Sequence, residues 1–258
     1  MTRTRIAIFG ASGRMGGALA RAAREREDVA VVAALVRRDS ARLGTFMPGA
    51  ELRYAASLDG DVDAIVDFAG ARGFDDAISL ALASRLAFVS GSTGLDDAQL
   101  AALTRASASI PVLWSANFSL GIAVLKRLVA DAATLLGPEF DAEIFEAHHR
   151  QKVDAPSGTA IALGQEIAKA RAQRFESVAR LGRSGHTGPR AEGELGFAVQ
   201  RCGDVIGEHT ATFAGRGERI ELTHRATHRS VFAHGALRAA AWLAQRRSGR
   251  YELADLLG

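Results

Sequence analysis

The sequence is poor in the residues that build disulfide frameworks and metal clusters. Among its 258 residues there is one cysteine, Cys202, which excludes a disulfide within the chain and a zinc site of several cysteines. A single thiol suits a reducing compartment, so we expect a cytoplasmic protein. Five prolines and a hydrophobic content of 48% are typical of a globular chain with a buried core.

Long apolar runs are missing as well. No stretch approaches the roughly 18 consecutive apolar residues that a membrane span requires. The beginning, MTRTRIAIFGASG, has a glycine turn where a signal peptide would have an apolar segment. We therefore expect neither a targeting signal nor a membrane partner.

Neither sign of charge is in large excess. The formal net charge is +3, from 32 basic and 29 acidic residues, and aromatic residues make up 6% of the chain. A nucleic-acid-binding module would need clustered Lys and Arg interleaved with aromatic residues. The densest basic runs, AKARAQR and AQRRSGR, lie in helix-like or terminal segments. We interpret them as solvated faces and expect no nucleic-acid partner.

From Ile6 to about Ser115 the chain alternates short β-branched runs with amphipathic segments rich in Ala and Leu. This order is typical of parallel strands joined by crossover helices. Strands are predicted in IAIF, VAVVAALV, AIVDF, AFVSG and PVLWS, and helices in GRMGGALARAARER, FDDAISLALASR and DDAQLAALTRASAS. The pattern predicts an α/β fold with a doubly wound parallel sheet.

The second half of the chain has a different pattern. After a predicted helix near Leu120 to Leu136, the strands EIFEAH, GFAVQRCG, HTATFAG and RIELTHRA follow one another with short glycine-containing turns. Such spacing predicts a mixed, mainly antiparallel sheet. A last helix, SVFAHGALRAAAWLAQR, is apolar enough to pack on the first sheet. We therefore predict one domain at 1–118 and 229–258 and a second α/β domain at 119–228.

A glycine-rich loop, FGASGRMGG, joins the first predicted strand to the first helix. Its glycines allow a tight turn that presents the first N–H groups of the helix to a pyrophosphate. The spacing is GxxGxxG and not the commoner GxGxxG, and a turn that only packs helix against strand is the alternative. Its place at the start of a βα series favours a dinucleotide site. The glycines are Gly10, Gly13 and Gly16, and the predicted cofactor contacts are Gly10, Ala11, Ser12, Gly13, Arg14 and Met15.

The end of the second strand bears on the choice of cofactor. It reads Leu35-Val36-Arg37-Arg38, and no carboxylate appears before Asp39. NAD sites place an acidic residue near this point, whereas arginine pairs with a 2′-phosphate. We favour NADPH, with Arg37 as a contact, and leave NADH possible; a merely solvated strand end is the alternative. Because ligands bind beyond the carboxyl ends of such strands, the further candidates are Phe68, Gly91, Ser92, Thr93, Ser115, Ala116, Asn117 and Phe118.

Residues 146–160, EAHHRQKVDAPSGTA, hold the densest group of chemically active side chains. His148, His149, Arg150 and Lys152 fall within five positions. If the strand continues, alternate residues share a face, so Arg150 and Lys152 lie on the side of His148. A lone histidine would be better interpreted as a satisfied core residue. The crowding of cations instead favours a functional site for a ligand that carries carboxylates.

A helix is predicted to begin directly behind this group. Pro156 favours an extended residue before it, and Ser157-Gly158-Thr159 lie where a helix presents free N–H groups and the positive end of its dipole. Such a terminus binds a carboxylate. A plain N-cap is the alternative for Ser157 and Thr159, and a capping or ion-pair role is expected for Asp154.

Other chemistries fit the sequence less well. The adjacent histidines of the group suit joint metal ligation poorly, and His224 and His228 lack a third ligand beside them, so no metal is expected. Cys202 has no neighbouring histidine, and we interpret it as a small core residue. A short-chain dehydrogenase would need Tyr-x-x-x-Lys, and neither Tyr54 nor Tyr251 has Lys at that spacing.

Nearly the whole chain resembles the dihydrodipicolinate reductase family. The resemblance is carried, in order, by GASGRMG, GSTG, SANFSLG, EAHHRQKVDAPSGTA, SGHTGPR and GEHTATF. It implies a Rossmann domain for a nicotinamide cofactor and a mixed α/β domain for substrate binding, whose sheet builds a homotetramer. It also implies NAD(P)H-dependent reduction of 4-hydroxy-tetrahydrodipicolinate, a dicarboxylate of the diaminopimelate route to lysine, with hydride transfer to C4 of the ring.

The resemblance also implies roles for individual residues. His148 would be the acid–base residue and Lys152 a proton donor, while His149, Gly158 and Thr159 would hold the substrate carboxylates. Hydride addition to a conjugated imine pushes electrons into an enamine, so a protonated group must deliver a proton and cations must stabilise the developing charge. We expect the cations beside His148 to disfavour its protonated form until a dianionic substrate binds.

Two departures from the family pattern are visible. Val36 stands where the family often has an acidic residue, and Ala69-Gly70-Ala71 stands where it usually has Ser or Thr with Pro two positions later. The alternatives are another nicotinamide-dependent imine or semialdehyde reductase acting on a dicarboxylate, and a non-catalytic NADP(H) sensor. A sensor would need no His-Lys group, so the presence of both His148 and Lys152 argues against it.

Overall fold

The computed structural model describes residues 3–258. The chain divides into two compact units. The first comprises the residues up to Leu120 together with Ser230–Gly258, and the second comprises Gly121–Arg229. Each unit contains a sheet of its own.

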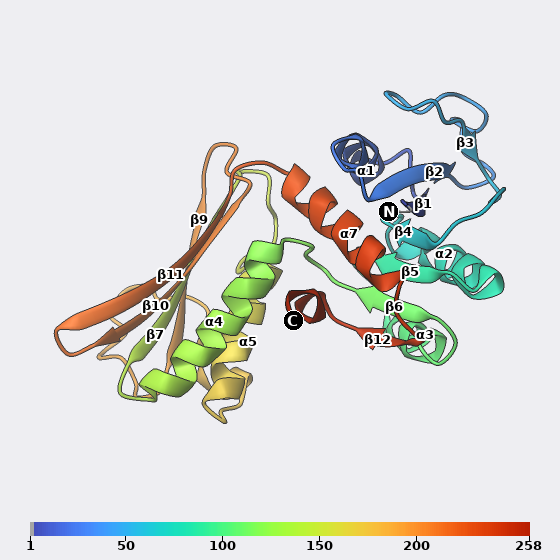
Figure 1. Ribbon diagram of the computed structural model, residues 1–258. Coiled ribbons are helices and arrows are strands. Elements are labelled where there is room, and N and C mark those ends of the chain that lie inside the picture. The colour runs from blue at the N-terminus through green and yellow to red at the C-terminus, as the bar shows by residue number, and fades with distance from the viewer. Residues whose placement is uncertain (1–2) are drawn as a thin grey trace. The chain divides into compact units, whose positions relative to one another are not determined.

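The first unit contains a seven-stranded sheet in the order β12-β6-β5-β4-β1-β2-β3 (Figure 1). All neighbouring strands pair in parallel. The strand order reverses between β1 and β4, which is where doubly wound sheets bind nucleotides. The predicted doubly wound sheet is therefore confirmed. The strands are β1 (Thr4–Phe9), β2 (Val29–Leu35), β3 (Tyr54–Ala55), β4 (Ala64–Asp67), β5 (Ala87–Ser90), β6 (Pro111–Trp114) and β12 (Gly249–Tyr251).

Helices pack on this sheet because their apolar residues recur at helical spacing. Buried Phe74 and Leu103, from two of the helices, share one core with Ile65 and Phe88 of the strands. The last helix, α7, packs on β4, β5 and β6, as predicted. The helices are α1 (Arg14–Arg24), α2 (Ala71–Ser84), α3 (Asp97–Ala106), α7 (Ser230–Leu243) and the 3₁₀ turn η1 (Leu253–Leu257).

Gly16 lies where helix α1 comes closest to the loop after β1. A Cβ atom on Gly16 would lie 2.3 Å from the carbonyl oxygen of Ala11. In Gly16→Ala, α1 must therefore shift, and we expect the free energy of unfolding to fall by about 1–3 kcal/mol.

The next residue of the same helix provides a matched control. A Cβ atom on Gly17 would meet only the flexible end of Arg21, at 3.4 Å. Gly17→Ala should be neutral or stabilising by up to about 1 kcal/mol, because Ala favours a helix over Gly. Chemical denaturation measures both variants, and equal stabilities would contradict this account of the glycine loop.

The second unit contains a five-stranded sheet in the order β11-β10-β7-β9-β8. Strand β10 pairs antiparallel with β7 and β11, whereas β9 pairs parallel with β7 and β8. More of the paired residues lie in antiparallel ladders than in parallel ones, so the predicted mixed sheet is confirmed. Its strands are β7 (Asp141–His148), β8 (Ala179–Arg180), β9 (Leu195–Arg201), β10 (Gly207–Gly215) and β11 (Glu218–Ala226).

Helices α4 and α5 cover one face of the second sheet (Figure 1). Val129 of α4 and Leu163 of α5 share a core with Ile144, Phe197 and Phe213 of the strands. Because side chains alternate along a strand, every second residue of β7 points into this covered face. The helices of this unit are α4 (Leu120–Leu136), α5 (Gly158–Ala170) and α6 (Phe175–Val178).

None of the helices built from the described residues combines the length and the apolar character that crossing a membrane requires.

Candidate active site

Strand β7 directs two neighbouring polar side chains toward the covered face of its sheet. Ala142 and Ile144 belong to the core, and Glu146 and His148 continue the same alternation. Glu146 is 0% exposed and His148 is 9% exposed. The strand ends at His148, so the imidazole lies at the end of the sheet with a carboxylate beneath it.

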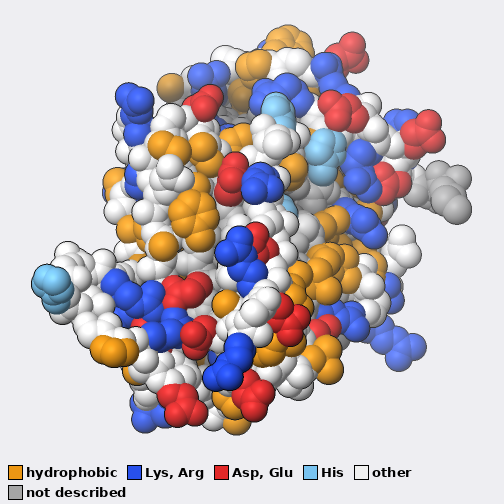
Figure 2. Space-filling view, turned by 90° about the vertical axis from the view of Figure 1, so that its left-hand side faces the viewer, with side chains coloured by type: hydrophobic (Ala, Val, Ile, Leu, Met, Phe, Trp, Pro, Cys, Tyr) orange, Lys and Arg blue, Asp and Glu red, His pale blue; other side chains and the backbone are white. Residues whose placement is uncertain are grey.

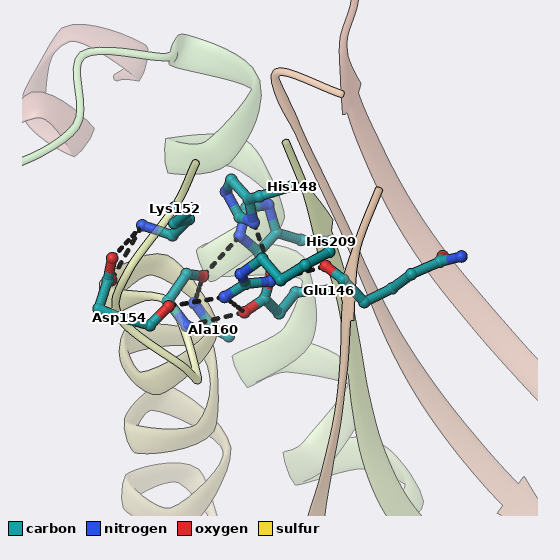
Figure 3. A network of polar contacts seen from close by, with 9 residues as sticks. Glu146, His148, Lys152, Asp154, Ala160 and His209 are labelled. Carbon is teal, nitrogen blue, oxygen red and sulfur yellow. Dashed lines mark hydrogen bonds and ion pairs between the residues drawn. The ribbon is translucent and has the colours of Figure 1, made fainter. Parts of the chain in front are cut away.

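The carboxylate of Glu146 receives four hydrogen bonds from three residues (Figure 3). Its Oε2 lies 2.5 Å from Nδ1 of His148. The guanidinium of Arg201 donates to both of its oxygens, at 2.8 Å each. The backbone N–H of Ser157 donates to Oε1 at 2.9 Å. The carboxylate is the acceptor in all four hydrogen bonds, so its surroundings favour the ionised form.

The titration of Glu146 reflects two opposing effects. Burial by itself raises the pKa of this carboxyl group, but the hydrogen bonds from Arg201, His148 and Ser157 hold the pKa below its ordinary value. Glu146 is therefore ionised at neutral pH.

The neighbouring imidazole is held neutral. Burial lowers the pKa of His148 below its ordinary value, the charges of Lys152 and Arg201 lower it further, and Glu146 opposes them. The direction is the expected one, but burial is the main cause and Arg201 is one of the cations. Since ionised Glu146 can only accept, the proton of neutral His148 is on Nδ1. Nε2 then borders Gly207, where a Cβ atom would lie 3.0 Å from it.

A second buried histidine, His209 of β10, packs against the first. The ring centroids of His148 and His209 are 5.1 Å apart with the planes at 76°, and His209 is 3% exposed. Burial is the main cause that lowers the pKa of His209 to about 3, and the repulsion that would arise if both imidazoles were protonated is the next. His209 is thus neutral, and its Nε2 lies 3.0 Å from Oγ of Ser157. No role was predicted for His209 from the sequence.

The loop after β7 carries the other predicted residues of this group. Nζ of Lys152 lies 2.7 and 2.9 Å from the two carboxylate oxygens of Asp154 (Figure 3), which lowers the pKa of Asp154. The predicted ion-pair role of Asp154 is confirmed. The predicted shared face of His148, Arg150 and Lys152 is wrong, because the strand ends at His148 and the loop beyond it does not alternate. His149 is half-buried in this loop, and Arg150 is exposed.

Helix α5 begins at Gly158. Ser157 is its N-cap, and its Oγ accepts a hydrogen bond from the N–H of Ala160 at 3.2 Å. The N-cap alternative is thus correct for Ser157. Gly158 is exposed, a Cβ atom on it would meet nothing within 4 Å, and half-buried Thr159 follows it. The first turn has no acidic residue, so this positive helix end can receive an anion.

These residues form one neighbourhood in the second unit. A neutral imidazole with a free Nε2 lies at the end of β7, the ammonium of Lys152 lies in the next loop, and an open helix N-terminus follows. Such an arrangement can bind a carboxylate and exchange a proton with the bound molecule. Among residues 3–258, no group of three or more His, Cys, Asp or Glu side chains is placed to hold a metal ion.

Cys202 is not a core residue, contrary to the prediction. Strand β9 ends at Arg201, and Cys202 lies just beyond it, partly exposed. Its backbone N–H donates to the carbonyl of His148 at 2.9 Å. The strand therefore ends one residue before Cys202, and the thiol is not buried in the core.

The glycine loop of the first unit has the geometry that a dinucleotide needs. Gly10 has a φ of +77°, and a Cβ atom there would lie 2.9 Å from the backbone of Ala69, so the loops after β1 and β4 approach closely. In the described chain no side chain caps helix α1, and its first turn holds no acidic residue. Free N–H groups there fit a pyrophosphate. Of the other loop candidates, Ala11 is buried, Met15 is half-buried, and Ser12, Gly13 and Arg14 are exposed.

The turns after β4 and β5 are joined by hydrogen bonds. Buried Ser92 donates from Oγ to Asp67 at 2.7 Å and accepts from the N–H of Gly70 at 2.9 Å. Its hydroxyl is thus engaged within the protein and shapes the turn. Burial raises the pKa of Asp67, against the hydrogen bonds that it accepts. The ring of Phe68 covers Gly91, where a Cβ atom would lie 2.1 Å from it.

The remaining candidates follow β5, β6 and β2. Thr93 and Ala116 are exposed, Asn117 is half-buried, and Ser115 donates from Oγ to the carbonyl of Asn117 at 2.7 Å. The rings of Phe68 and buried Phe118 are 5.7 Å apart.

Arg37 lies just beyond β2. Its side chain is 60% exposed, and its Nε is 3.5 Å from Oδ1 of Asp39. An exposed pair of this kind contributes little, so Arg37 is accessible to a phosphate group.

Comparison with known proteins agrees with this fold. A family model described as dihydrodipicolinate reductase, N-terminus, matches residues 4–118, and one described as dihydrodipicolinate reductase, C-terminus, matches residues 121–257. The dipicolinate-bound dihydrodipicolinate reductase of Paenisporosarcina sp. TG-14 is similar in structure, with a TM-score of 0.77 at 24% identity over 97% of this chain and 98% of that chain.

Two relatives are similar in sequence over their full length. The 4-hydroxy-tetrahydrodipicolinate reductase of Pseudoalteromonas translucida is 42% identical over 100% of this chain and 99% of its own. The enzyme of the same name from Alkalilimnicola ehrlichii is 44% identical over 99% of each chain. The chain therefore belongs to the dihydrodipicolinate reductase family of NAD(P)H-dependent oxidoreductases.

Proposed function

We propose that the protein reduces 4-hydroxy-tetrahydrodipicolinate to tetrahydrodipicolinate in the diaminopimelate route to lysine. Two full-length relatives carry the name of this activity. The observation that carries the proposal is the neutral, carboxylate-held His148 near Lys152 and the open N-terminus of α5. The substrate needs both features, because it carries two carboxylates and must receive a proton.

The anion site defines how the substrate is held. The first-turn N–H groups of α5, at Gly158 and Thr159, receive one carboxylate in this proposal, and the positive helix end adds to the attraction. His149 contributes a further contact from the loop after β7. The charge of Lys152 favours a dianion over a neutral molecule.

The proton chemistry follows from the electron flow. The 4-hydroxyl group of the substrate first leaves as water, which makes the ring a conjugated imine. A nicotinamide cofactor, when bound, would supply the hydride, which we propose reaches C4 of the ring. The conjugated imine then becomes an enamine, and a protonated group must deliver a proton to it. His148, through Nε2, and Lys152, through Nζ, are the two donors proposed. The cations around them also stabilise the charge that develops.

Binding of a dicarboxylate should raise the pKa of His148. The pKa is low in the free protein because of burial and nearby cations, and a bound anion favours the charged imidazolium. At a pH between the pKa of His148 in the free protein and its pKa in the complex, the protein should therefore take up a proton when the ligand binds. An NMR titration of the histidines with and without dipicolinate, assigned with His148→Gln, measures this. Identical titration curves would rule out His148 as the group that responds to the ligand.

We propose NADPH as the preferred cofactor, with NADH possible. Arg37 is exposed at the end of β2 and carries only a weak pair with Asp39, so its guanidinium can bind a 2′-phosphate.

Arg37→Ala should raise the KM for NADPH by about 10- to 100-fold, the value of a hydrogen bond to a charged group. The KM for NADH should hardly change, since NADH lacks this phosphate. Arg42→Ala removes the same charge from an exposed position of the same loop and serves as the control. Steady-state kinetics measures the KM of each variant for both cofactors. An equal rise of the KM for NADPH and for NADH in Arg37→Ala would contradict the assignment of Arg37 to the 2′-phosphate.

We also propose a homotetramer, which works in the cytoplasm. One face of the five-stranded sheet is covered by α4 and α5, and within residues 3–258 no helix covers the other, which carries Phe145 and Thr212. Figure 2 shows hydrophobic side chains among charged ones on the side of the molecule that carries this sheet. Light scattering tests the assembly, and Phe145→Asp should lower the measured mass. An unchanged mass in that variant, or a monomeric wild type, would contradict this interface.

A further inference from the structure

The buried carboxylate of Glu146 takes no direct part in the proposed reaction. Burying an ion is costly unless its hydrogen bonds are satisfied, and four bonds are made to this one group. Only one of the four leads to a residue that exchanges a proton with substrate, namely His148. The other three lead to Arg201 and Ser157, which hold the carboxylate itself.

Arg201 connects the segments that build the site. It lies on β9 directly beside His148, its partner in the parallel ladder with β7. Besides its two bonds to Glu146, it donates to the carbonyl of Asp154 at 2.6 Å. Asp154 in turn pairs with Lys152. One guanidinium therefore fixes the carboxylate and the loop that carries the second proposed proton donor.

We propose that Glu146 is a positioning residue that holds His148 as the Nδ1–H tautomer and directs Nε2 to the proton transfer. Arg201 and the N–H of Ser157 keep the carboxylate in place as an acceptor. This inference rests on the proposed function, because it assigns how the acid–base residue of that reaction is held.

The charged and titratable groups around His148 are few and come from every strand beside it. Glu146 and His148 lie on β7, Arg201 on β9 and His209 on β10, with Lys152 in the loop. His209 contacts His148 edge-on and stays neutral, so it does not compete for the carboxylate. Among these groups Glu146 is the anion, and its effect on the pKa of His148 is opposite to that of the cations Lys152 and Arg201.

The space at Nε2 supports the same assignment. Gly207 opens β10 at this point, and a Cβ atom there would lie 3.0 Å from Nε2 and 3.3 Å from Cδ2 of His148. Because Gly207 has no side chain, no Cβ atom crowds this edge of the ring, while Nδ1 is engaged by Glu146 at 2.5 Å. In this proposal Nδ1 holds the ring in place through Glu146, and Nε2 exchanges the proton.

Glu146→Gln tests the inference, because the amide keeps the shape but loses the charge. Burial and the cations Lys152 and Arg201 then act on His148 unopposed, so its pKa falls. Turnover that needs protonated His148 is lost as the pH rises through this pKa. In the plot of kcat against pH, the falling limb should therefore move to lower pH by about 1–3 units, which is the effect of one nearby opposite charge. Turnover at low pH should be least affected.

Glu143→Gln is the matched control. Glu143 lies on the same strand but points to the other face, where it pairs with Arg183 and Arg190. The same substitution there should leave the limb in place. A merely structural role of Glu146 would instead lower kcat equally at every pH, and an unmoved limb in Glu146→Gln overturns the inference.

NMR gives a readout that is independent of activity. The ¹⁵N shifts of His148 should show the Nδ1–H tautomer in the wild-type protein, and mixed tautomers or the Nε2–H form would overturn the inference. If Glu146→Gln does not fold, Arg201→Lys can be used instead. This variant loses the bidentate hydrogen bonding to Glu146 and should move the falling limb of the kcat–pH profile in the same direction. Absence of reductase activity in the wild type would contradict the proposed function, whereas these shifts test the hold on His148 in either case.

Discussion

Replacing Lys152 by Ala should lower turnover by at least about a hundredfold. A positioned acid typically contributes about that factor or more, and the ammonium of Lys152 is one of the two proposed proton donors. It lies in the loop between β7 and α5, held by Asp154 at 2.7 Å. Steady-state kinetics should show the loss mainly in kcat, because the helix N-terminus of α5 remains to bind carboxylate.

Lys169→Ala is the control for this prediction. Lys169 is exposed in the last turn of α5, so the variant makes the same chemical change in the same unit and should keep nearly normal turnover. Near-normal turnover in Lys152→Ala would remove Lys152 from the mechanism.

Replacing His148 by Gln should lower turnover by about a hundredfold to ten-thousandfold, the range of general acid–base catalysis. Glutamine can still hydrogen-bond to Glu146, but it has no nitrogen that exchanges a proton near neutral pH. The variant should still bind dipicolinate, because the anion site at α5 is unchanged, and should lose only the part of the affinity that is coupled to protonation of His148.

His234→Gln controls for the loss of an imidazole elsewhere. His234 lies on α7, 3.5 Å from the exposed Glu25, and its replacement should leave turnover unchanged. A His148→Gln variant with more than a tenth of normal turnover would contradict the acid–base role.

The fold was largely predictable because its signals are local. The alternation of β-branched and amphipathic runs predicted the doubly wound sheet, and the apolar last helix was correctly placed on it. The short strands β3, β8 and β12 were not predicted, since strands of two or three residues show no periodicity and form only where a neighbouring strand pairs with them.

The site was predictable only in part. The run from His148 to Thr159 is contiguous, so its residues could be identified together. Arg201 and His209 could not, because they reach His148 through the pairing of β9 and β10 with β7, which brings together residues that are far apart in the sequence. Glu146 did have a local signal, since it lies two residues before His148 on the same face of one strand.

The two wrong predictions have the same physical cause. Strand periodicity was extended past the last paired residue, to Arg150 and Lys152 after β7 and to Cys202 after β9. The roles of the predicted cofactor contacts stay predictions, and the hydroxyl groups of Ser92 and Ser115 already form hydrogen bonds within the protein.

The most direct test is cofactor oxidation by the purified protein, with the substrate formed in place from pyruvate and aspartate semialdehyde by the preceding aldolase. NADPH and NADH are compared in parallel. We predict rapid, substrate-dependent oxidation, faster with NADPH than with NADH. Equal rates would keep the reductase but contradict the assignment of Arg37 to a 2′-phosphate. No oxidation of either cofactor, despite cofactor binding, would contradict the proposed reaction.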